Sequence, residues 1–199
     1  NPIGSVADLR GLRMRIPGMG GDVMSRLGAS VQVIAAGEIY PALERGAIDA
    51  TEWVGPYDDE KLGFQRIAKH YYYPGWHEPS ATLTLMVNRR AYDELPEGYR
   101  SALEVAAAEQ NAEMLEQYDA ANPPALARLV AEGVKVLPFP ADLLQAAWRE
   151  SNALLEERAA ENPQFRTVYE PWKAFRDQSF RFFNGGEQAY ANFAFAQVG

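Results

Sequence analysis

Three short β-prone runs, separated by stretches long enough for helices, constrain the first quarter of this chain more than any other feature. The runs cover residues 12–16, 30–35 and 48–53, and helical patterns over 20–27 and 37–45 separate them, with glycine or proline at most boundaries. Parallel strands need a crossover of a dozen or so residues, usually a helix, whereas antiparallel strands can be joined by a tight turn. The spacing therefore predicts βαβ units and an α/β fold with a largely parallel sheet.

The second half of the chain is predicted to be mostly helical. A further β-prone run covers 81–87, helical patterns cover 99–117, 141–160 and 165–195, and a short strand pattern covers 134–137. Pro123-Pro124 predicts a kink or a restart in the first of these helices. The change in character near residue 90 predicts two parts: an α/β ligand-binding lobe over 1–88, and long helices with one strand of the other lobe over 89–199.

Charge and residue types exclude several classes of function. The 199 residues include 27 acidic and 19 basic side chains, a net charge of -8 at pH 7. Nucleic acids and anionic membranes would be repelled at long range, so no nucleic-acid partner is expected. There is no cysteine, and His70 and His77 are the only histidines, which leaves little for thiolate, zinc or Ser-His-Asp chemistry. A small anionic solute held by one local arginine stays compatible with this balance.

Arg15 is the first candidate binding residue. It stands near the predicted end of the first strand, ahead of the glycine-rich run PGMGG at 17–21. Ligands of open α/β sheets bind beyond the carboxyl ends of strands, and a guanidinium can hold a carboxylate with two parallel hydrogen bonds. The alternative is that Arg15 belongs, with Arg10 and Arg13, to a solvated basic face. The glycines do not have the spacing of a dinucleotide site.

Glu52 and Glu78 are candidate cation ligands. Glu52 and Trp53 end the third predicted strand, which brings them to the same sheet edge as Arg15. Carboxylates and main-chain oxygens are the ligands that Na⁺ and Ca²⁺ take. The alternatives are a surface glutamate paired with any nearby base, or two carboxylates acting as acid and base, as in glycosidases. No nucleophile or base is arranged around the two glutamates, which favours binding over catalysis.

Two neighbouring runs allow two interpretations each. The aromatic run YYYPGWHEP at 71–79 is suited to a small-molecule pocket and equally to a core. The acidic run Asp58-Asp59-Glu60 is typical of the first turn of a helix, and we assign it a structural role.

At these residues the chain resembles a known family. The run LRMRIPGMGGDVMSRLGASVQVIAAGEIYPALERGAIDATEWVGPYDD, then YYYPGWHEP, then LTLMVNRRAYDELP, is similar to the solute-binding proteins of tripartite ATP-independent periplasmic (TRAP) transporters. The closest similarity is to the DctP-like subgroup that captures 2-oxo or 2-hydroxy monocarboxylates such as pyruvate and lactate. The resemblance implies a periplasmic-binding-protein-like fold of two α/β lobes around a long connecting helix. It implies a bacterial periplasmic protein that is not an enzyme.

The resemblance also assigns roles to residues. It implies that Arg15 holds the substrate carboxylate, with Trp53 and Tyr57 also contacting the substrate. It implies that Glu52, the backbone of Trp53 and Glu78 coordinate Na⁺ or Ca²⁺, which bridges to the substrate. The implied partners are the TRAP membrane permease subunits and a second copy, which makes a homodimer by exchange of an aromatic-rich C-terminal helix over 172–195.

The chain departs from the family in length. Family members are about half as long again and begin with a signal peptide and a further α/β segment, so we expect this chain to be the C-terminal ~60% with the N-terminal segment missing. Three functions therefore stay open: a monocarboxylate-binding protein, a carboxylate-based enzyme using Glu52 and Glu78, and a truncated oligomerising piece with a non-functional site.

Overall fold

The computed structural model describes residues 2–80 and 82–197. Its internal contacts divide the chain into two compact units, one ending at Ala147 and the other beginning at Trp148, so that the division falls inside helix α6 (Ala141–Glu161). The predicted boundary near residue 90 divides the chain into two lobes rather than into these two compact units. It stays a prediction.

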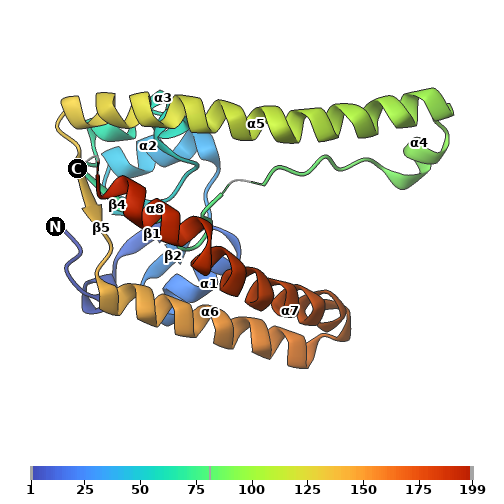
Figure 1. Ribbon diagram of the computed structural model, residues 1–199. Coiled ribbons are helices and arrows are strands. Elements are labelled where there is room, and N and C mark those ends of the chain that lie inside the picture. Colours follow the sequence, from blue (N-terminus) through green and yellow to red (C-terminus); the bar gives the residue numbers. More distant parts are fainter. Residues whose placement is uncertain (1, 81, 198–199) are drawn as a thin grey trace. The chain divides into compact units, whose positions relative to one another are not determined.

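The first unit begins with the predicted βαβ units (Figure 1). Its first elements are η1 (Val6–Leu9), β1 (Arg13–Arg15), α1 (Gly18–Arg26), β2 (Ser30–Gln32), α2 (Ala36–Glu44) and β3 (Ala50–Thr51). The strands form a parallel sheet in the order β2-β1-β3, with Arg15 opposite Gln32 on one side and Thr51 on the other. The prediction of a parallel sheet is therefore confirmed, and its strands are shorter than the β-prone runs.

A second, two-stranded sheet is only half predicted by the sequence. After α3 (Pro56–Lys61) and η2 (Phe64–Arg66) comes β4 (His70–Tyr73), which pairs in parallel with β5 (Lys135–Pro138). The strand pattern at 134–137 predicts β5, whereas β4 lies in the aromatic run, where no strand is predicted. The partner of β4 lies far along the chain, and a local pattern carries no information about such a pairing.

Two apolar clusters hold the first unit together. One buries Leu9, Ile16, Met24, Ala29 and Leu143. The other buries Ile39, Ala42, Leu43, Ile48 and Phe64, with Trp53 packed against it. Both clusters draw on residues of the βαβ region, so they fix the sheet edge at which β1 and β3 end.

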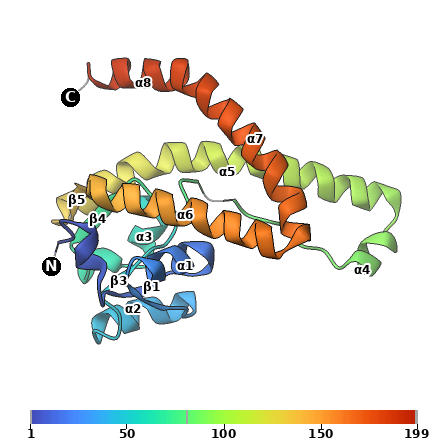
Figure 2. The ribbon, with the colours of Figure 1, turned by 90° about the horizontal axis from the view of Figure 1, so that it is seen from below.

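Helix α5 (Glu97–Ala131) is a continuous helix of 35 residues, so the chain does not restart a helix at Pro123-Pro124, whereas a kink there stays a prediction. It runs alongside α3 in both views (Figures 1 and 2). The Tyr118 hydroxyl donates to Asp58 before the prolines, and Arg128 pairs with Glu60 after them. These contacts hold both halves of α5 to the same short helix, which opposes a break between them.

The β-prone run at 81–87 is not a strand over residues 82–87, and Ala81 lies outside the described residues. The segment is extended, and it leads into α4 (Arg89–Asp93) and then α5 (Figure 1). Leu83, Leu85 and Met86 are more than half exposed. High β propensity describes side chains that suit a sheet, and a strand also needs a partner for its backbone.

The second unit is helical, as predicted. It holds the rest of α6, α7 (Pro163–Gly185) and α8 (Glu187–Phe195). Helix α7 returns along α6: Arg166 donates to the Ala159 carbonyl, Tyr169 donates to Glu156, and Arg176 reaches Asn152. Many large aromatic side chains of α7 and α8 are exposed, namely Trp172, Phe175, Phe180, Phe182, Phe183, Tyr190, Phe193 and Phe195.

Candidate functional site

Arg15 lies at the carboxyl end of the central strand, as predicted, and its side chain is buried with 8% of the residue exposed. Its Nη1 donates to the Glu52 carboxylate at 2.5 Å, and its Nε donates to the Ile34 carbonyl at 3.3 Å. The guanidinium also lies 5.3 Å from the centre of the Trp53 ring. The interpretation of Arg15 as part of a solvated face does not hold, whereas Arg13 on the same strand is exposed and pairs with Asp49.

The main chain brings Glu52 to Arg15. Residue 52 directly follows β3, and its N–H donates to the Arg15 carbonyl at 3.3 Å, which extends the pairing of β1 with β3. Burial raises the pKa of the Glu52 carboxylate, and the charges of Glu78 and Asp59 raise it further, while Arg15 opposes them. A buried carboxylate beside other carboxylates is a place where a bound cation would relieve electrostatic repulsion.

The glycine run after Arg15 allows a close approach by the segment that contains His77. A Cβ at Gly20 would lie 3.3 Å from the His77 Cβ, and a Cβ at Gly21 would lie 2.6 Å from the Ile16 carbonyl oxygen. His77 Nε2 lies 4.0 Å from the Glu52 carboxylate, and burial lowers the pKa of His77. His77 is not among the site residues predicted from the sequence. Its position between Trp76 and Glu78 in the aromatic run is the signal that could have found it.

The three predicted cation ligands differ in how far they are buried and in which segment carries them. Most of the Glu52 side chain is buried beside Arg15, and Trp53 is the next residue along the same turn. Glu78 is exposed, and it acts on both Glu52 and His77 through its charge. Within residues 2–80 and 82–197, no three His, Cys, Asp or Glu side chains are grouped to hold a metal ion. The predicted set of two glutamates and one main-chain oxygen would be only part of a coordination sphere.

Tyr57 lies on α3, where it contacts α5 and the Lys61 side chain of its own helix. Its ring meets the Tyr118 ring edge-on with centroids 6.4 Å apart, and the Lys61 ammonium lies over its face. Its N–H donates to the Asn122 side chain. The expected substrate contact of Tyr57 stays a prediction.

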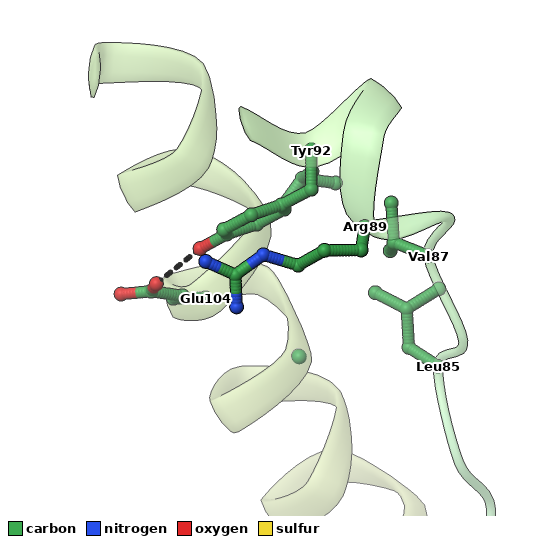
Figure 3. Close-up of a pocket in the computed structure, with 7 residues that line it drawn as sticks. Leu85, Val87, Arg89, Tyr92 and Glu104 are labelled. Atoms are coloured by element: carbon green, nitrogen blue, oxygen red, sulfur yellow. Dashed lines mark hydrogen bonds between the residues drawn. The ribbon is translucent and has the colours of Figure 1, made fainter. Parts of the chain in front are cut away.

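A separate hollow lies outside this site, between the extended segment and α4–α5 (Figure 3). It is lined by Leu85, Val87, Arg89, Tyr92, Leu103, Glu104 and Ala107, and the Tyr92 hydroxyl donates to Glu104 across it. The lining is mainly apolar, and its arginine pairs with Asp93. Because the Arg89 side chain is also largely exposed to solvent, the hollow does not offer a small carboxylate a buried cation of the kind that Arg15 provides.

Most of the chain matches a known protein family. Residues 1–162 match the family described as bacterial extracellular solute-binding protein, family 7, known as DctP. The chain belongs to this family. Its relatives are TRAP periplasmic solute-binding proteins, which are not enzymes, so the enzyme interpretation of Glu52 and Glu78 is set aside.

Three relatives are especially similar. A monocarboxylate 2-oxoacid-binding periplasmic protein of Nostoc sp. is 55% identical over 96% of this chain and 53% of its own length. A TRAP transporter solute-binding protein of Bordetella bronchiseptica, a mixed-occupancy dimer with copurified calcium and picolinate, has a TM-score of 0.96 and 49% identity over 100% of this chain and 59% of its own. A TRAP periplasmic solute-binding protein of Pseudoalteromonas atlantica, with bound sodium and pyruvate, has a TM-score of 0.90 and is 39% identical. The match covers 96% of this chain and 59% of the Pseudoalteromonas protein.

The structure of the chain matches part of the two-lobe TRAP solute-binding fold, as expected from the resemblance. The chain spans little more than half the length of each of the three relatives. Among the described residues, no helix is both long and apolar enough to cross a membrane.

Proposed function

We propose that this chain carries the arginine side of a binding site for a small 2-oxo monocarboxylate, such as pyruvate, with a Na⁺ or Ca²⁺ ion beside it. The observation that carries the proposal is the buried Arg15 guanidinium, already holding a carboxylate, that of Glu52, at 2.5 Å. A substrate carboxylate would share this guanidinium or displace Glu52 from it. A buried guanidinium binds a carboxylate strongly because little water competes for it.

The cation has a separate role in the proposal. Glu52, the Trp53 carbonyl and Glu78 would supply oxygens to the ion, and the substrate would complete its coordination. A cation that draws Glu52 toward itself would free Arg15 for the substrate, so the two ligands would bind with positive coupling. The calcium and sodium in the Bordetella and Pseudoalteromonas proteins support this assignment.

Calorimetry with pyruvate, with and without Ca²⁺ or Na⁺, tests the function. It is run on the 199-residue chain and, in parallel, on the chain joined to the part of the Bordetella protein that the chain does not cover, since the relatives are longer. Binding in the extended form alone supports the proposal, and it means that the chain holds only part of the site. Binding in neither form would favour a non-functional site.

Arg15→Ala tests the central residue. We expect pyruvate affinity to fall by about 100-fold, because two charge-assisted hydrogen bonds are lost. Arg13→Ala is the matched control, since Arg13 lies on the same strand but is exposed and paired with Asp49. The role of Arg15 fails if both variants bind pyruvate as the wild type does.

Glu78→Gln tests the cation. We expect cation affinity to fall by about tenfold, since a charged oxygen ligand becomes neutral, while the free energy of unfolding changes by less than about 0.5 kcal/mol at this exposed position. Cation titrations and denaturant unfolding measure the two effects. An unchanged cation affinity would remove Glu78 from the ligand set.

The partners follow from the same proposal. A loaded solute-binding protein would deliver its ligand to TRAP permease subunits at the periplasmic face of the membrane. A homodimer is proposed through the exposed aromatic face of α7 and α8, with exchange of the C-terminal helix. The dimer of the Bordetella relative supports it.

A further inference from the structure

A buried carboxylate joins the two segments that carry the proposed cation ligands. Asp59 lies on α3 with 8% of its surface exposed. Its Oδ1 accepts the backbone N–H groups of Val54 at 3.2 Å and Gly55 at 3.3 Å, and its Oδ2 accepts the Tyr71 hydroxyl at 2.6 Å. Each carboxylate oxygen therefore binds a different part of the chain.

Both parts lead directly to the site. Val54 follows Glu52 and Trp53 in the turn after β3, so a restraint on its N–H group orients the Trp53 peptide. Tyr71 lies on β4, whose chain continues through a short turn to His77 and Glu78. The sheet does not supply this link, because β3 pairs with β1 and β4 pairs with β5.

We propose that Asp59 is a positioning residue, which holds the Glu52–Trp53 turn against β4 so that one cation can reach Glu52, the Trp53 carbonyl and Glu78 together. The inference rests on the proposed function for the identity of these ligands. Asp59 itself is not a ligand in this proposal, since its two oxygens are occupied by three protein donors.

The chemistry of the contact supports more than a packing role. Burying a carboxylate is costly, and a neutral side chain could accept the same two backbone N–H groups at lower cost. The neighbouring Asp58 shows the simpler arrangement: it lies on the same helix and accepts the Tyr118 hydroxyl, also at 2.6 Å, in a contact that only joins α3 to α5. The two Tyr–Asp hydrogen bonds have the same length and join different parts of the chain, and Asp58 is also more exposed and pairs with Lys61.

That similarity supplies a matched test. Tyr71→Phe and Tyr118→Phe each remove one hydroxyl and leave the ring. Ca²⁺ affinity is measured by calorimetry on the extended form, in which the chain is joined to the part of the Bordetella protein that it does not cover. The thermal midpoint of unfolding is measured on the same protein. We expect Tyr71→Phe to weaken Ca²⁺ binding by about tenfold, the value of a hydrogen bond to a charged group, and Tyr118→Phe to stay within about twofold of the wild type.

A second readout needs no ligand. Amide hydrogen exchange of Val54 and Gly55 in the 199-residue chain should quicken by about fivefold or more in Tyr71→Phe, because the carboxylate that binds these N–H groups loses its anchor. It should not change in Tyr118→Phe.

The outcomes separate the two proposals. A wild type that binds neither Ca²⁺ nor Na⁺ in the extended form overturns the proposed function, and the positioning role with it. If the wild type binds Ca²⁺ and the two variants bind it equally, the positioning role alone is overturned. A lower thermal midpoint in both variants, with weaker Ca²⁺ binding and faster exchange in Tyr71→Phe alone, supports positioning.

Discussion

The Arg15–Glu52 ion pair places a full positive and a full negative charge where the side chains are about nine-tenths buried. Such pairs contribute little to stability on balance, because desolvation offsets most of the attraction. Removing one member is costly, since it leaves the other charge buried and alone. An ion pair that contributes little to stability is compatible with the proposed exchange of partners with an incoming carboxylate and cation.

Asp59 gives stability a pH dependence of defined sign. Burial raises the pKa of Asp59 from 3.8 to about 6 in the folded chain. The folded state thus favours the protonated form, so the contribution of this group is fully present below pH 4 and is lost as pH rises through 6. We expect the stability of the wild type relative to Asp59→Asn to fall between pH 4 and 7, by up to about 3 kcal/mol. Denaturant unfolding at both pH values measures it, and a difference that does not change with pH would contradict it.

Gly21 should not tolerate a side chain. A Cβ there would lie 2.6 Å from the Ile16 carbonyl oxygen, so α1 would have to move away from the strand end that carries Arg15. We expect Gly21→Ala to lower the free energy of unfolding by about 2 kcal/mol. Gly37→Ala is the control, because Gly37 lies in α2, where an added Cβ would meet nothing within 4 Å, and it should be neutral or stabilising. Equal midpoints of unfolding for the two variants would argue against the close approach.

At the scale of elements, the sequence predicts those helices and strands whose boundaries are marked by nearby residues, such as glycine and proline. The βαβ region is predictable because glycine and proline mark its boundaries. Helices α6, α7 and α8 are predictable from their composition and from the glycines at 185 and 186. Strand β4, the unbroken α5 and the unpaired segment at 82–87 are not, since each depends on what lies beside it in space.

In the second unit, Arg176 is the side chain most expected to hold α7 on α6. Its guanidinium lies 5.1 Å from the Trp172 ring centre and 5.7 Å from that of Trp148, and it donates to Asn152. We expect Arg176→Ala to destabilise this unit by about 1–2 kcal/mol. Arg181→Ala, at an exposed position on the same helix, should have little effect. Tryptophan fluorescence during denaturant unfolding measures both changes, and equal effects would remove the special role of Arg176.

At the scale of the whole molecule, exposed apolar surface is the feature most in need of a partner. Large aromatic side chains of α7 and α8 are exposed in the isolated chain, and where such side chains gather on a surface they mark interfaces. We expect the chain to dimerise in sedimentation equilibrium, and Phe182→Asp with Phe193→Asp to weaken the dimer by about tenfold or more. Asn192→Asp, which adds a charge to α8 without removing an aromatic ring, is the control. A monomeric wild type would contradict this use of the helices.

The sequence by itself determined the βαβ alternation, the place of Arg15 at the end of a strand and the helical second unit, because each follows from periodicity and from nearby glycine and proline. It also predicted that Glu52 and Trp53 lie at the same sheet edge as Arg15, and the family resemblance grouped them with Glu78 around one cation. Only the tertiary structure decided that Glu52 pairs with Arg15, that β4 pairs with β5, and that Asp59 ties the turn after β3 to Tyr71. Three of these contacts are distant in sequence: Asp59 and Tyr71 are 12 positions apart, Arg15 and Glu52 are 37 apart, and His70 and Lys135 are 65 apart. Such pairings depend on how the elements pack, and packing is not encoded in any short window of residues.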